Sequence, residues 1–470
     1  ISKTNMVGGF ARVATIVKNE KLINPNSLYF DAGDYFTGPY ISSLTKGEAI
    51  IDVLNHMNID AACIGNHEFD HGWQNTINQL SKAHFPILNG NIFYTNSQKL
   101  IWNHPYYIIN KNGLRIGVIG LHGKSAFYET VADETRRGIE CKEELIYLKK
   151  YIQELKGKTD LIVLLTHEGM PGRESTRGPV DVSRTLQADI DLAKQVNGLD
   201  IIITGHAHLG TPKAIISNNT IIVSTDALGI EVGKLNIEYN IKTHKIQSYT
   251  NNLQVVNADS IKEDVEVKKV IDYWDKKMER VTSEKICTTP VMLFRSYGEE
   301  STLGNLATDA MMHSFPGNDF AVINSGGLRD EIDSGSISMA NIISVFPFPN
   351  TIVQAVLKGE DIRKIFEYSA GLTNGILQVS KEVEFVYNPN LPIGKRIVIL
   401  NLNGSPIQNN KLYKVLAPNF LTDGGDGYVN FKNMLSQKNT QVVIMNSVSN
   451  YLKTFKIYQP SLDGRIKSIK

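Results

Sequence analysis

Gly65-Asn66-His67-Glu68-Phe69-Asp70 is the stretch that decides the fold, because it joins an apolar segment abruptly to polar side chains. Residues 60–64, which precede it, form an apolar run of the length of a buried strand. Gly72 follows closely, and we expect a helix over 72–83. In α/β sheets ligands bind at the carboxyl ends of the strands, so this junction predicts a binding site.

Three other apolar segments end in the same manner, in side chains that can bind metals. Because the carboxyl ends of parallel strands meet at one edge of a sheet, we expect the four ends to form one crevice. The further motifs are Phe30-Asp31-Ala32-Gly33-Asp34 after residues 28–30, Thr166-His167-Glu168 after residues 160–165, and Thr204-Gly205-His206-Ala207-His208 after residues 199–203.

The candidate metal ligands combine one carboxylate, one amide carbonyl and three imidazoles. This mixture of oxygen and nitrogen donors suits Zn, Mn, Fe or Co better than Ca or Mg alone. A carboxylate such as that of Asp34 can bridge two ions, and a two-ion site clamps the attacking and leaving oxygens of a displacement at phosphorus. The predicted ligands are Asp34, Asn66, His167, His206 and His208.

Each motif alone has an ordinary structural explanation. An Asp-Gly-Asp segment is usually a turn, and a histidine after a strand is more often a cap or a satisfied core residue. A zinc protease is a further alternative, because His67-Glu68-Phe69-Asp70-His71 matches His-Glu-x-x-His. That mechanism needs an α-helix, whereas Gly65 and Gly72 flank the segment and indicate a turn. The coincidence of four strand ends favours the metal crevice.

The composition is that of a multidomain globular protein. The 470 residues suggest two or three domains, and 42% of them are hydrophobic. With 49 basic and 48 acidic residues, the net charge of +1 gives no global attraction for nucleic acid or anionic membranes. No apolar run reaches the roughly 18 residues that span a bilayer. Three cysteines do not make a disulfide framework, although one pair could bridge, and Cys63 fits a core strand.

Strands alternate with helices from about residue 28 to residue 200, which predicts an α/β layered sheet. Strands with period-2 alternation follow and end near Val256. A charged helix expected over 259–283 carries apolar residues down one side and fits a connection between domains. The predicted organisation is a catalytic domain at 1–257, a linker helix at 258–284 and a mixed second domain at 285–470, which opens with a helix over 302–312.

Three segments of the second domain carry side chains that could bind a nucleotide. Asn324-Ser325-Gly326-Gly327-Leu328-Arg329 offers an arginine fork for phosphate. Phe346-Pro347-Phe348-Pro349 holds aromatic residues that look exposed, and the glycine-rich loop 418–427 holds one phenylalanine and two aspartates. Two rings can sandwich a base, at about 1–3 kcal/mol per stacked base. Taken alone, the turn could be structural and the phenylalanines could be core.

The motifs at 31–34, 65–70 and 205–208 resemble, in this order, those of the calcineurin-like metallophosphoesterase superfamily. Val7-Gly8-Gly9-Phe10-Ala11-Arg12 and the second domain resemble its 5′-nucleotidase family, so that the resemblance covers nearly the whole chain. It implies a four-layer α/β-β/α metallophosphoesterase-like N-terminal domain followed by a mixed α+β domain. It also implies two divalent ions, with Zn, Mn or Co expected, and rotation between the domains.

The resemblance assigns roles to individual residues. Asp34 would bridge the ions, His67 would stabilise the charge that develops on the phosphoryl group or leaving oxygen, and Asp70 would orient His67. A metal-bound hydroxide would be the nucleophile. Asn66, His167 and His206 would hold one ion and His208 the other, while Asn324 and Arg329 would contact phosphate, Phe348 and Phe420 would stack the base, and Asp426 would bind the ribose.

Two departures from the family pattern stand out. The family supplies further ligands from an Asp-x-His motif on its first strand, which is absent here; we expect this strand upstream of Ile1, the alternative being an impaired site. An arginine that the family places before Glu300-Ser301-Thr302-Leu303-Gly304-Asn305 corresponds to Tyr297. Arg295, two residues upstream, could replace it or be solvated.

The sequence thus predicts hydrolysis of nucleoside 5′-phosphates to nucleoside and phosphate, a step of nucleotide catabolism. The partner is a small nucleotide, without nucleic acid or a transmembrane segment, and the family resemblance implies a periplasmic, cell-surface or secreted location. Two alternatives stay open: a non-catalytic nucleotide-binding homologue, and a phosphoesterase for a non-nucleotide ester.

Overall fold

The computed structural model describes residues 6–170, 185–371 and 375–469. These residues form two compact units. The division along the chain falls inside helix α9 (Val265–Thr282). Of the described residues, unit 1 comprises 6–36, 45–170 and 185–276, and unit 2 comprises 37–44, 277–371 and 375–469.

The centre of unit 1 is a six-stranded sheet with the order β10-β11-β9-β8-β6-β5. Its four middle strands run parallel, and β10 and β5 are antiparallel edges. Parallel strands covered on both faces need continuous apolar sequence, and every residue of β8 is buried. The strands are β5 (Tyr106–Lys111), β6 (Leu114–His122), β8 (Leu161–Glu168), β9 (Ile201–His206), β10 (Ile215–Ser217) and β11 (Thr220–Val223).

A smaller parallel sheet of three strands, β1-β2-β3, packs between the large sheet and a layer of helices. Side chains alternate along a strand, so Ala61 and Cys63 of β2 face the large sheet while Ala62 faces the helices. The strands are β1 (Phe30–Asp31), β2 (Ala61–Cys63) and β3 (Ile87–Leu88), and the helices are α1 (Phe10–Ile23), α3 (Glu48–Leu54) and α4 (Trp73–Leu80).

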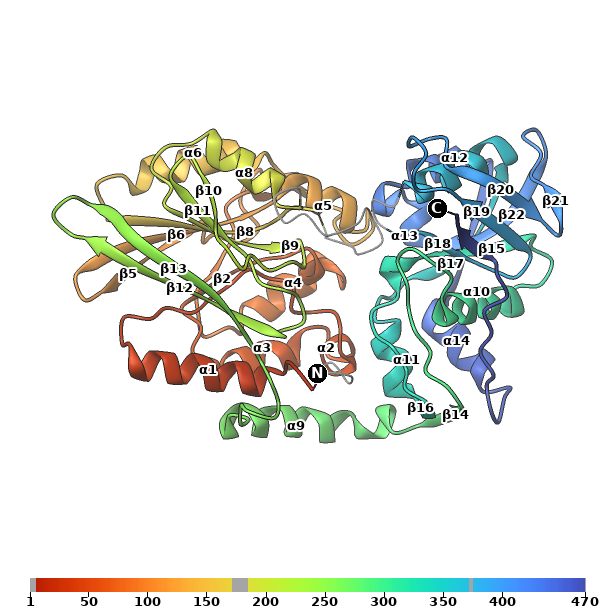
Figure 1. Ribbon diagram of the computed structural model, residues 1–470, viewed down its shortest axis with the longest axis horizontal. Coiled ribbons are helices and arrows are strands. Elements are labelled where there is room, and N and C mark those ends of the chain that lie inside the picture. Colours follow the sequence, from red (N-terminus) through yellow and green to blue (C-terminus); the bar gives the residue numbers. More distant parts are fainter. Residues whose placement is uncertain (1–5, 171–184, 372–374, 470) are drawn as a thin grey trace. The chain divides into compact units, whose positions relative to one another are not determined.

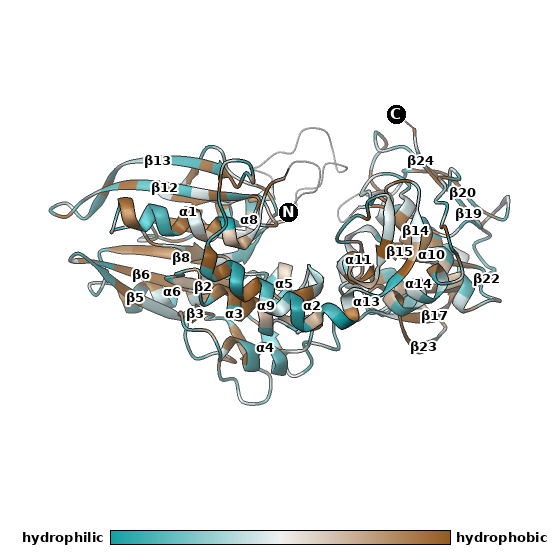
Figure 2. Ribbon diagram, turned by 90° about the horizontal axis from the view of Figure 1, so that it is seen from below, coloured by the Kyte–Doolittle hydropathy of each residue, from teal (hydrophilic) through white to brown (hydrophobic). Residues whose placement is uncertain are grey.

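Helices α6 (Glu144–Leu155) and α8 (Gln187–Lys194) cover the opposite face of the large sheet, where Leu148 and Leu192 pack with Ile162 and Ile202. Figure 1 shows α6 and α8 on one side of unit 1 and α1 and α3 on the other. In Figure 2 the strands β6 and β8 between these layers are hydrophobic. The predicted four-layer α/β-β/α architecture is therefore confirmed.

Several smaller elements complete unit 1. A long ribbon, β12 (Glu231–Asn240) and β13 (Lys245–Val255), carries the period-2 alternation that the sequence predicted after residue 220. Leu235 and Ile237 of this ribbon pack on the core of the large sheet. The remaining elements are α5 (Lys124–Thr130), β4 (Ile92–Tyr94) and β7 (Ile139–Cys141), the last two forming a small antiparallel pair.

Some predicted boundaries differ from the structure. The first strand begins at Phe30 rather than Leu28, and the linker helix begins at Val265 rather than Asp259. Strands β8 and β9 extend further than expected, because their ladder continues to Glu168 and His206. The helix α1 was not anticipated.

Unit 2 is built on a mixed five-stranded sheet with the order β18-β15-β22-β17-β23. Unit 2 has two hydrophobic cores, one on each face of this sheet, and alternate residues of β15 point into them. Ala321 and Ile323 pack with α10, α11 and α14, whereas Phe320 and Val322 pack with α12 and a four-stranded sheet. The elements are α10 (Thr302–Ser314), α11 (Met339–Val345), α12 (Gly359–Ala370), α14 (Ile444–Leu452), β15 (Phe320–Asn324), β17 (Thr351–Lys358), β18 (Leu377–Val379), β19 (Val383–Tyr387), β20 (Ile397–Leu402), β21 (Ser405–Pro406), β22 (Leu412–Pro418), β23 (Ser436–Val443) and β24 (Ile466–Ser468).

Cys63, Cys141 and Cys287 are all buried and free, so none of them forms the disulfide that the sequence left open. In the part of the chain that the structure describes, no helix has both the length and the apolar character needed to cross a bilayer.

Candidate active site

Asp34 and Asn66 are carried by two loops that follow β1 and β2. Two glycines allow these loops to touch. A Cβ atom on Gly33 would lie 2.5 Å from the backbone nitrogen of Gly65, and a Cβ atom on Gly65 would lie 2.3 Å from Asp34 Oδ1. Gly33 also has a φ of 90°, which glycine adopts without strain. The glycines of both motifs therefore serve the close approach that brings Asp34 beside Asn66.

Four of the five predicted metal ligands converge at this point. One ligand atom each from Asp34, His167 and His206 lie within 4.8 Å of one another. His167 Nε2 lies 3.0 Å from Asp34 Oδ2 and 3.1 Å from Asn66 Oδ1, and His206 Nδ1 lies 3.0 Å from the same amide oxygen. Asn66, His167 and His206 are buried. The structure therefore brings together residues that are separated by up to 172 positions of the chain.

The orientation of these atoms fits a cation. His167 Nδ1 lies 2.7 Å from the carbonyl oxygen of Ala32, so it carries the ring proton and donates to that carbonyl. The lone pair of Nε2 then faces the Asp34 carboxylate and the Asn66 carbonyl, neither of which can donate. Acceptors that face one another repel unless a proton or a metal ion lies between them. The mixture of imidazole, carboxylate and amide oxygen suits a divalent transition ion.

The charges of the cluster agree with this interpretation. Burial opposes charge on His167, but Asp34, the Ala32 carbonyl and Glu68 together raise the pKa of His167 to about 9. Despite burial, the same histidine lowers the pKa of Asp34 well below its usual value. Burial, together with His167, lowers the pKa of His206 well below 6.5. One positive charge is therefore stabilised among these residues, and a metal ion can provide it.

His208 stands apart from the other predicted ligands. It is exposed and does not belong to the group formed by Asp34, His167 and His206. Both His206 and His208 have a positive φ, 67° and 56°, while Ala207 between them is completely buried. The backbone therefore turns sharply after β9 and directs the two histidines differently, which is compatible with the predicted role of His208 at another ion.

His67 and Asp70 form the pair that the sequence predicted. His67 Nδ1 lies 2.8 Å from Asp70 Oδ2, and the backbone N–H of His67 donates to Asp34 Oδ1 at 2.8 Å. The Asp70 carboxylate thereby fixes the ring and its tautomer. The backbone bond connects His67 to the candidate metal ligands Asp34, Asn66, His167 and His206, which are called the metal cluster below. Residues 67–69 form a single 3₁₀ turn, and Gly72 has a φ of 85°. This segment is no α-helix, which excludes the zinc-protease interpretation.

Glu68 joins the two loops that carry Asp34 and Asn66, a contact that the sequence did not reveal. Its fully buried carboxylate accepts backbone N–H groups from Asp34 at 2.9 Å, Tyr35 at 2.5 Å, Phe36 at 3.2 Å and Gly65 at 2.6 Å. Burial and the nearby Asp34 raise the pKa of Glu68 to about 7, while the N–H groups oppose this shift. Its place in the motif was the available signal, but three of its four partners come from a loop more than 30 residues away.

A group of buried polar residues lies behind the metal cluster and was also missed. His122 is completely buried at the end of β6, opposite His167 in the strand register, and burial lowers the pKa of His122 to about 3. Burial raises the pKa of Glu168 to about 8 and that of Asp189 to about 7. Burial therefore favours the uncharged forms of His122 and Glu168 at pH 7, and Asp189 is protonated in about half of the molecules there. An isolated His or Asp on a buried face carries no distinguishing pattern in sequence.

In unit 2 the structure joins two predicted substrate residues. Asn324 Nδ2 donates to Asp426 Oδ2 at 2.8 Å, and both residues are buried. Asp426 has a φ of 53°, and the Tyr368 hydroxyl donates to its carbonyl at 2.8 Å. Among the described residues, Asn324 Oδ1 is buried without a hydrogen-bond partner. This oxygen is an acceptor that a ligand could satisfy.

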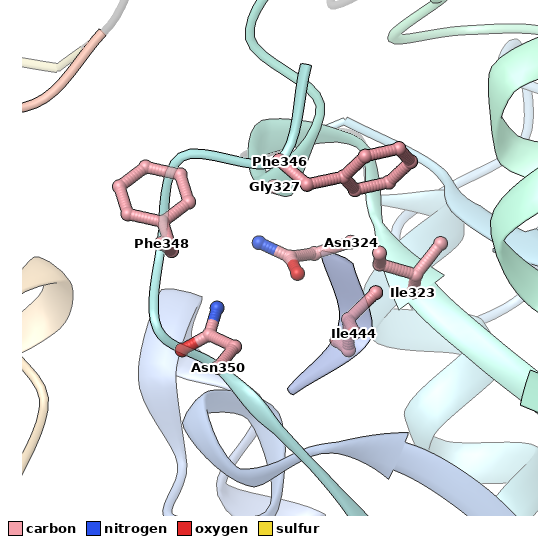
Figure 3. A pocket seen from close by; sticks show the side chains of 7 residues that line it. All are labelled: Ile323, Asn324, Gly327, Phe346, Phe348, Asn350 and Ile444. Atoms are coloured by element: carbon pink, nitrogen blue, oxygen red, sulfur yellow. The ribbon is translucent and has the colours of Figure 1, made fainter. Parts of the chain in front are cut away.

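A pocket beside Asn324 contains the predicted Phe348. Figure 3 shows Asn324 between Phe348 on one side and Ile323 and Ile444 on the other, with Asn350 below. The Arg329 guanidinium carbon lies 5.7 Å from the centre of the Phe348 ring, so the predicted phosphate and base residues are neighbours. Phe346, which looked exposed in the sequence, is only 4% exposed, because it packs in the helical core of unit 2.

Phe420 lies in the glycine-rich loop as predicted, partly buried at the margin of the core. A Cβ atom on Gly425 would lie 2.4 Å from Phe420 Cε2, so the ring rests directly on this glycine. Arg295 reaches the loop that carries Arg329: its Nη1 donates to the Leu328 carbonyl at 3.3 Å and to the Tyr297 hydroxyl at 3.2 Å. Arg295 is therefore not a freely solvated side chain.

Comparison with known proteins gives a consistent result over the whole chain. Residues 6–210 match the family model for calcineurin-like phosphoesterase, and residues 281–434 match that for the 5′-nucleotidase C-terminal domain. The human 5′-nucleotidase is 28% identical over 99% of this chain and 86% of its own length. A snake venom 5′-nucleotidase from Naja atra is also 28% identical, over 98% of this chain and 92% of its own.

Solved structures agree. The crystal structure of a 5′-nucleotidase precursor from Thermus thermophilus matches with a TM-score of 0.85 and 26% identity, over 98% of this chain and 94% of the other. A sulfate thiohydrolase from the same organism shares the fold, with a TM-score of 0.78, 18% identity, and coverage of 98% and 83%. The fold alone therefore does not define the substrate. With a calcineurin-like phosphoesterase domain followed by a 5′-nucleotidase C-terminal domain, the chain belongs to the 5′-nucleotidase family of phosphoric monoester hydrolases.

Proposed function

We propose that this protein hydrolyses nucleoside 5′-phosphates to nucleoside and inorganic phosphate with the help of divalent metal ions. The observation that carries the proposal is the convergence of Asp34, His167 and His206 within 4.8 Å, with Asn66 Oδ1 facing both imidazoles. The relatives named 5′-nucleotidase, which match over the full chain, support the choice of substrate class.

The metal residues divide into two groups. Asp34, Asn66, His167 and His206 would hold one ion, and Asp34 and His208 would contribute to a second. Zn, Mn or Co suit this mixture of donors. When bound, such ions neutralise charge on phosphoryl oxygens and lower the pKa of a coordinated water.

His67 has a different task in this proposal. Asp70 holds its imidazole with Nδ1 protonated, and the backbone bond to Asp34 fixes its distance from the metal residues. From this position His67 stabilises the negative charge that develops on the phosphoryl group or on the leaving oxygen. Asp70 keeps the ring oriented and supports its positive charge.

The substrate residues of unit 2 bind the remainder of the nucleotide. Phe348 and Phe420 stack the base, Arg329 binds phosphate, and Asp426 accepts from the ribose hydroxyls. Asn324 would bind phosphate beside Arg329. Its Nδ2 donates one of its two N–H groups to Asp426, and the second N–H is a donor of the kind that a phosphate oxygen accepts.

A phosphate-release panel tests this function. Nucleoside 5′-monophosphates and a small aryl phosphate are compared at defined Zn, Mn or Co concentrations. Phe420→Ala is expected to raise KM for the nucleotide about 10-fold, from the loss of about 1–3 kcal/mol of stacking, while sparing the aryl phosphate. Equal effects on both substrates would remove Phe420 from base recognition.

The panel also separates the alternatives. Activity that survives exhaustive chelation would contradict metal dependence. Hydrolysis of the aryl phosphate without hydrolysis of nucleotides would favour a different ester as substrate. Nucleotide binding without phosphate release would favour a non-catalytic homologue.

We further propose a periplasmic, cell-surface or secreted location, because snake venom enzymes are among the relatives. Fractionation of the source cells with an antibody to the protein tests this, and detection only in the cytosolic fraction would contradict it.

A further inference from the structure

Gln378 lies on β18 and is completely buried between two segments that carry proposed substrate residues. In the antiparallel pairing of β18 with β15 it stands opposite Ile323, the residue before Asn324. On its other side is the segment 295–301. A buried amide in such a place needs a partner for each polar atom.

The Gln378 side chain forms hydrogen bonds to both segments, with its acceptor on 295–301 and its donor on 295–301 and on Ser325. Its Oε1 accepts the backbone N–H of Ser301 at 2.9 Å and the Ser301 hydroxyl at 3.0 Å. Its Nε2 donates to the Glu299 carbonyl at 2.9 Å and to the Ser325 hydroxyl at 3.4 Å. Ser325 belongs to the loop of Asn324 and Arg329. One side chain therefore ties both segments to β18.

Further hydrogen bonds beside Gln378 also link the segment 295–301 to the loop 324–329. The Ser325 hydroxyl donates to the Ile376 carbonyl at 2.5 Å, and the Ile376 N–H donates to the Tyr297 carbonyl at 2.7 Å. Arg295 then reaches the carbonyl of Leu328, next to Arg329. The relative position of the two cationic side chains therefore depends on how 295–301 and 324–329 are held together.

The space around the amide admits few other side chains. Ser301 is the N-cap of α10 and accepts from the Gly304 N–H at 3.0 Å. A Cβ atom on Gly304 would lie 2.3 Å from Gln378 Oε1, so the first turn of the helix rests directly on the amide. A shorter side chain would lose these contacts, and a branched one would collide with the helix.

We propose that Gln378 is a positioning residue that sets the affinity for the nucleotide by holding the Arg295 segment against the Asn324–Arg329 loop. This role rests on the nucleotide hydrolysis proposed above. Gln378 itself touches no substrate. Its effect should fall on substrate binding by unit 2 and leave the metal residues of unit 1 unchanged.

The test replaces Gln378 by Met, which keeps its length but leaves the Ser301 N–H and the Glu299 carbonyl without partners. We expect Gln378→Met to raise KM for a nucleoside 5′-monophosphate at least 10-fold, with kcat changed less than 3-fold. The metal content should stay at the wild-type level, and kcat for the small aryl phosphate should change less than 3-fold, because the metal residues of unit 1 are untouched. Gln378→Glu serves as a second variant, because it keeps the acceptor toward Ser301 and replaces the donor toward Glu299; we expect a KM increase of the same order.

Ser380→Ala is the matched control. Ser380 is fully buried two residues along the chain, and its hydroxyl accepts the Ala321 N–H at 2.9 Å; among the described residues it has no hydrogen bond to 295–301 or 324–329. The control should lower the thermal stability and leave KM unchanged. A KM within 2-fold of wild type in both Gln378 variants overturns the proposal, as does a fall in kcat that is larger than the rise in KM. Absence of nucleotide hydrolysis by the wild type overturns the proposed function and this role with it.

Discussion

At the scale of single residues, the metal cluster is defined by which atom each side chain presents. The Ala32 carbonyl accepts a hydrogen bond from the His167 Nδ1–H. The other ring nitrogen, Nε2, is then directed at Asp34 and Asn66. A residue of the same type without that carbonyl could turn its ring and present the wrong nitrogen. The chemistry of the site therefore depends on backbone partners as much as on the ligands themselves.

Replacement of His67 by Ala tests the proposed charge stabilisation. We expect turnover of a nucleoside monophosphate to fall at least about 100-fold, because a group that acts on the transition-state charge is lost. Metal content, measured by elemental analysis, should not change, since His67 is not a proposed ligand. His56→Ala, at an exposed histidine of the same unit, is the control. Unaltered turnover would exclude His67 from the mechanism.

Asp189 gives a prediction on pH. The pKa of its carboxyl is raised to about 7, from 3.8, by burial, which outweighs the opposing hydrogen bond from Thr204. The folded state therefore binds this proton more tightly than the unfolded state does. Protonation stabilises the folded protein at low pH, and this contribution is lost as the pH rises through about 4 to 7. Asp189→Asn should therefore increase the free energy of unfolding at pH 8 by about 1–3 kcal/mol.

The measurement is thermal unfolding of chelated protein between pH 4 and pH 8. The advantage of the Asn variant over wild type should grow up to about pH 7 and then level off. An advantage that does not vary with pH would show that Asp189 is not protonated in the folded state.

At the scale of elements, the loop after β1 is held by one carboxylate. Glu68 accepts the N–H groups of residues 34–36 and of Gly65, so both ligand-bearing loops depend on it. Residues 34–36 and Gly65 lie outside the helices and strands of the structure, so their N–H groups are not part of a helix or a sheet. The short strands β1 and β2 end just before the site, and Glu68 replaces the missing ladder bonds.

Replacement of Glu68 by Gln should weaken metal binding about 10- to 100-fold, because one acceptor oxygen becomes an NH₂ group that faces N–H donors. Competition with a chelator of known affinity measures the change. Glu48→Gln, at a partly exposed carboxylate on α3, is the control. If Glu68→Gln binds metal as tightly as wild type, the carboxylate does not position the ligands.

At the scale of the whole molecule, the two units should respond differently to metal. All five proposed metal ligands belong to unit 1. A ligand that binds only the folded state stabilises it by about 2.7 kcal/mol at a concentration of 100 times Kd. Calorimetry of the full chain should therefore show one unfolding transition that rises with Zn and one that does not.

His167→Ala provides the control, since it removes a central ligand and should abolish the metal-dependent shift. Equal displacement of both transitions in the wild type would contradict the assignment of the metal residues to unit 1 alone.

The sequence by itself determined the layers and predicted which side chains meet at the strand ends. Apolar periodicity is a local property, so the alternation of strands and helices is visible in the chain, as in 160–165 and 199–203. The carboxyl-end rule then brings Asp34, Asn66, His167 and His206 together without coordinates. The family resemblance, carried by consecutive motif residues, supplied the second domain and the substrate class.

Only the tertiary structure decided the partners that come from distant parts of the chain. Such partners leave no pattern in neighbouring residues: they include the N–H groups of residues 34–36 on Glu68, the Ala32 carbonyl on His167, the neighbours that bury Phe346 and the bonds of Gln378. Each depends on backbone atoms that any amino acid possesses, so residue type does not reveal them. The physical reason is that a buried polar atom is satisfied by whatever lies beside it in space, and that neighbour is set by the packing of the layers.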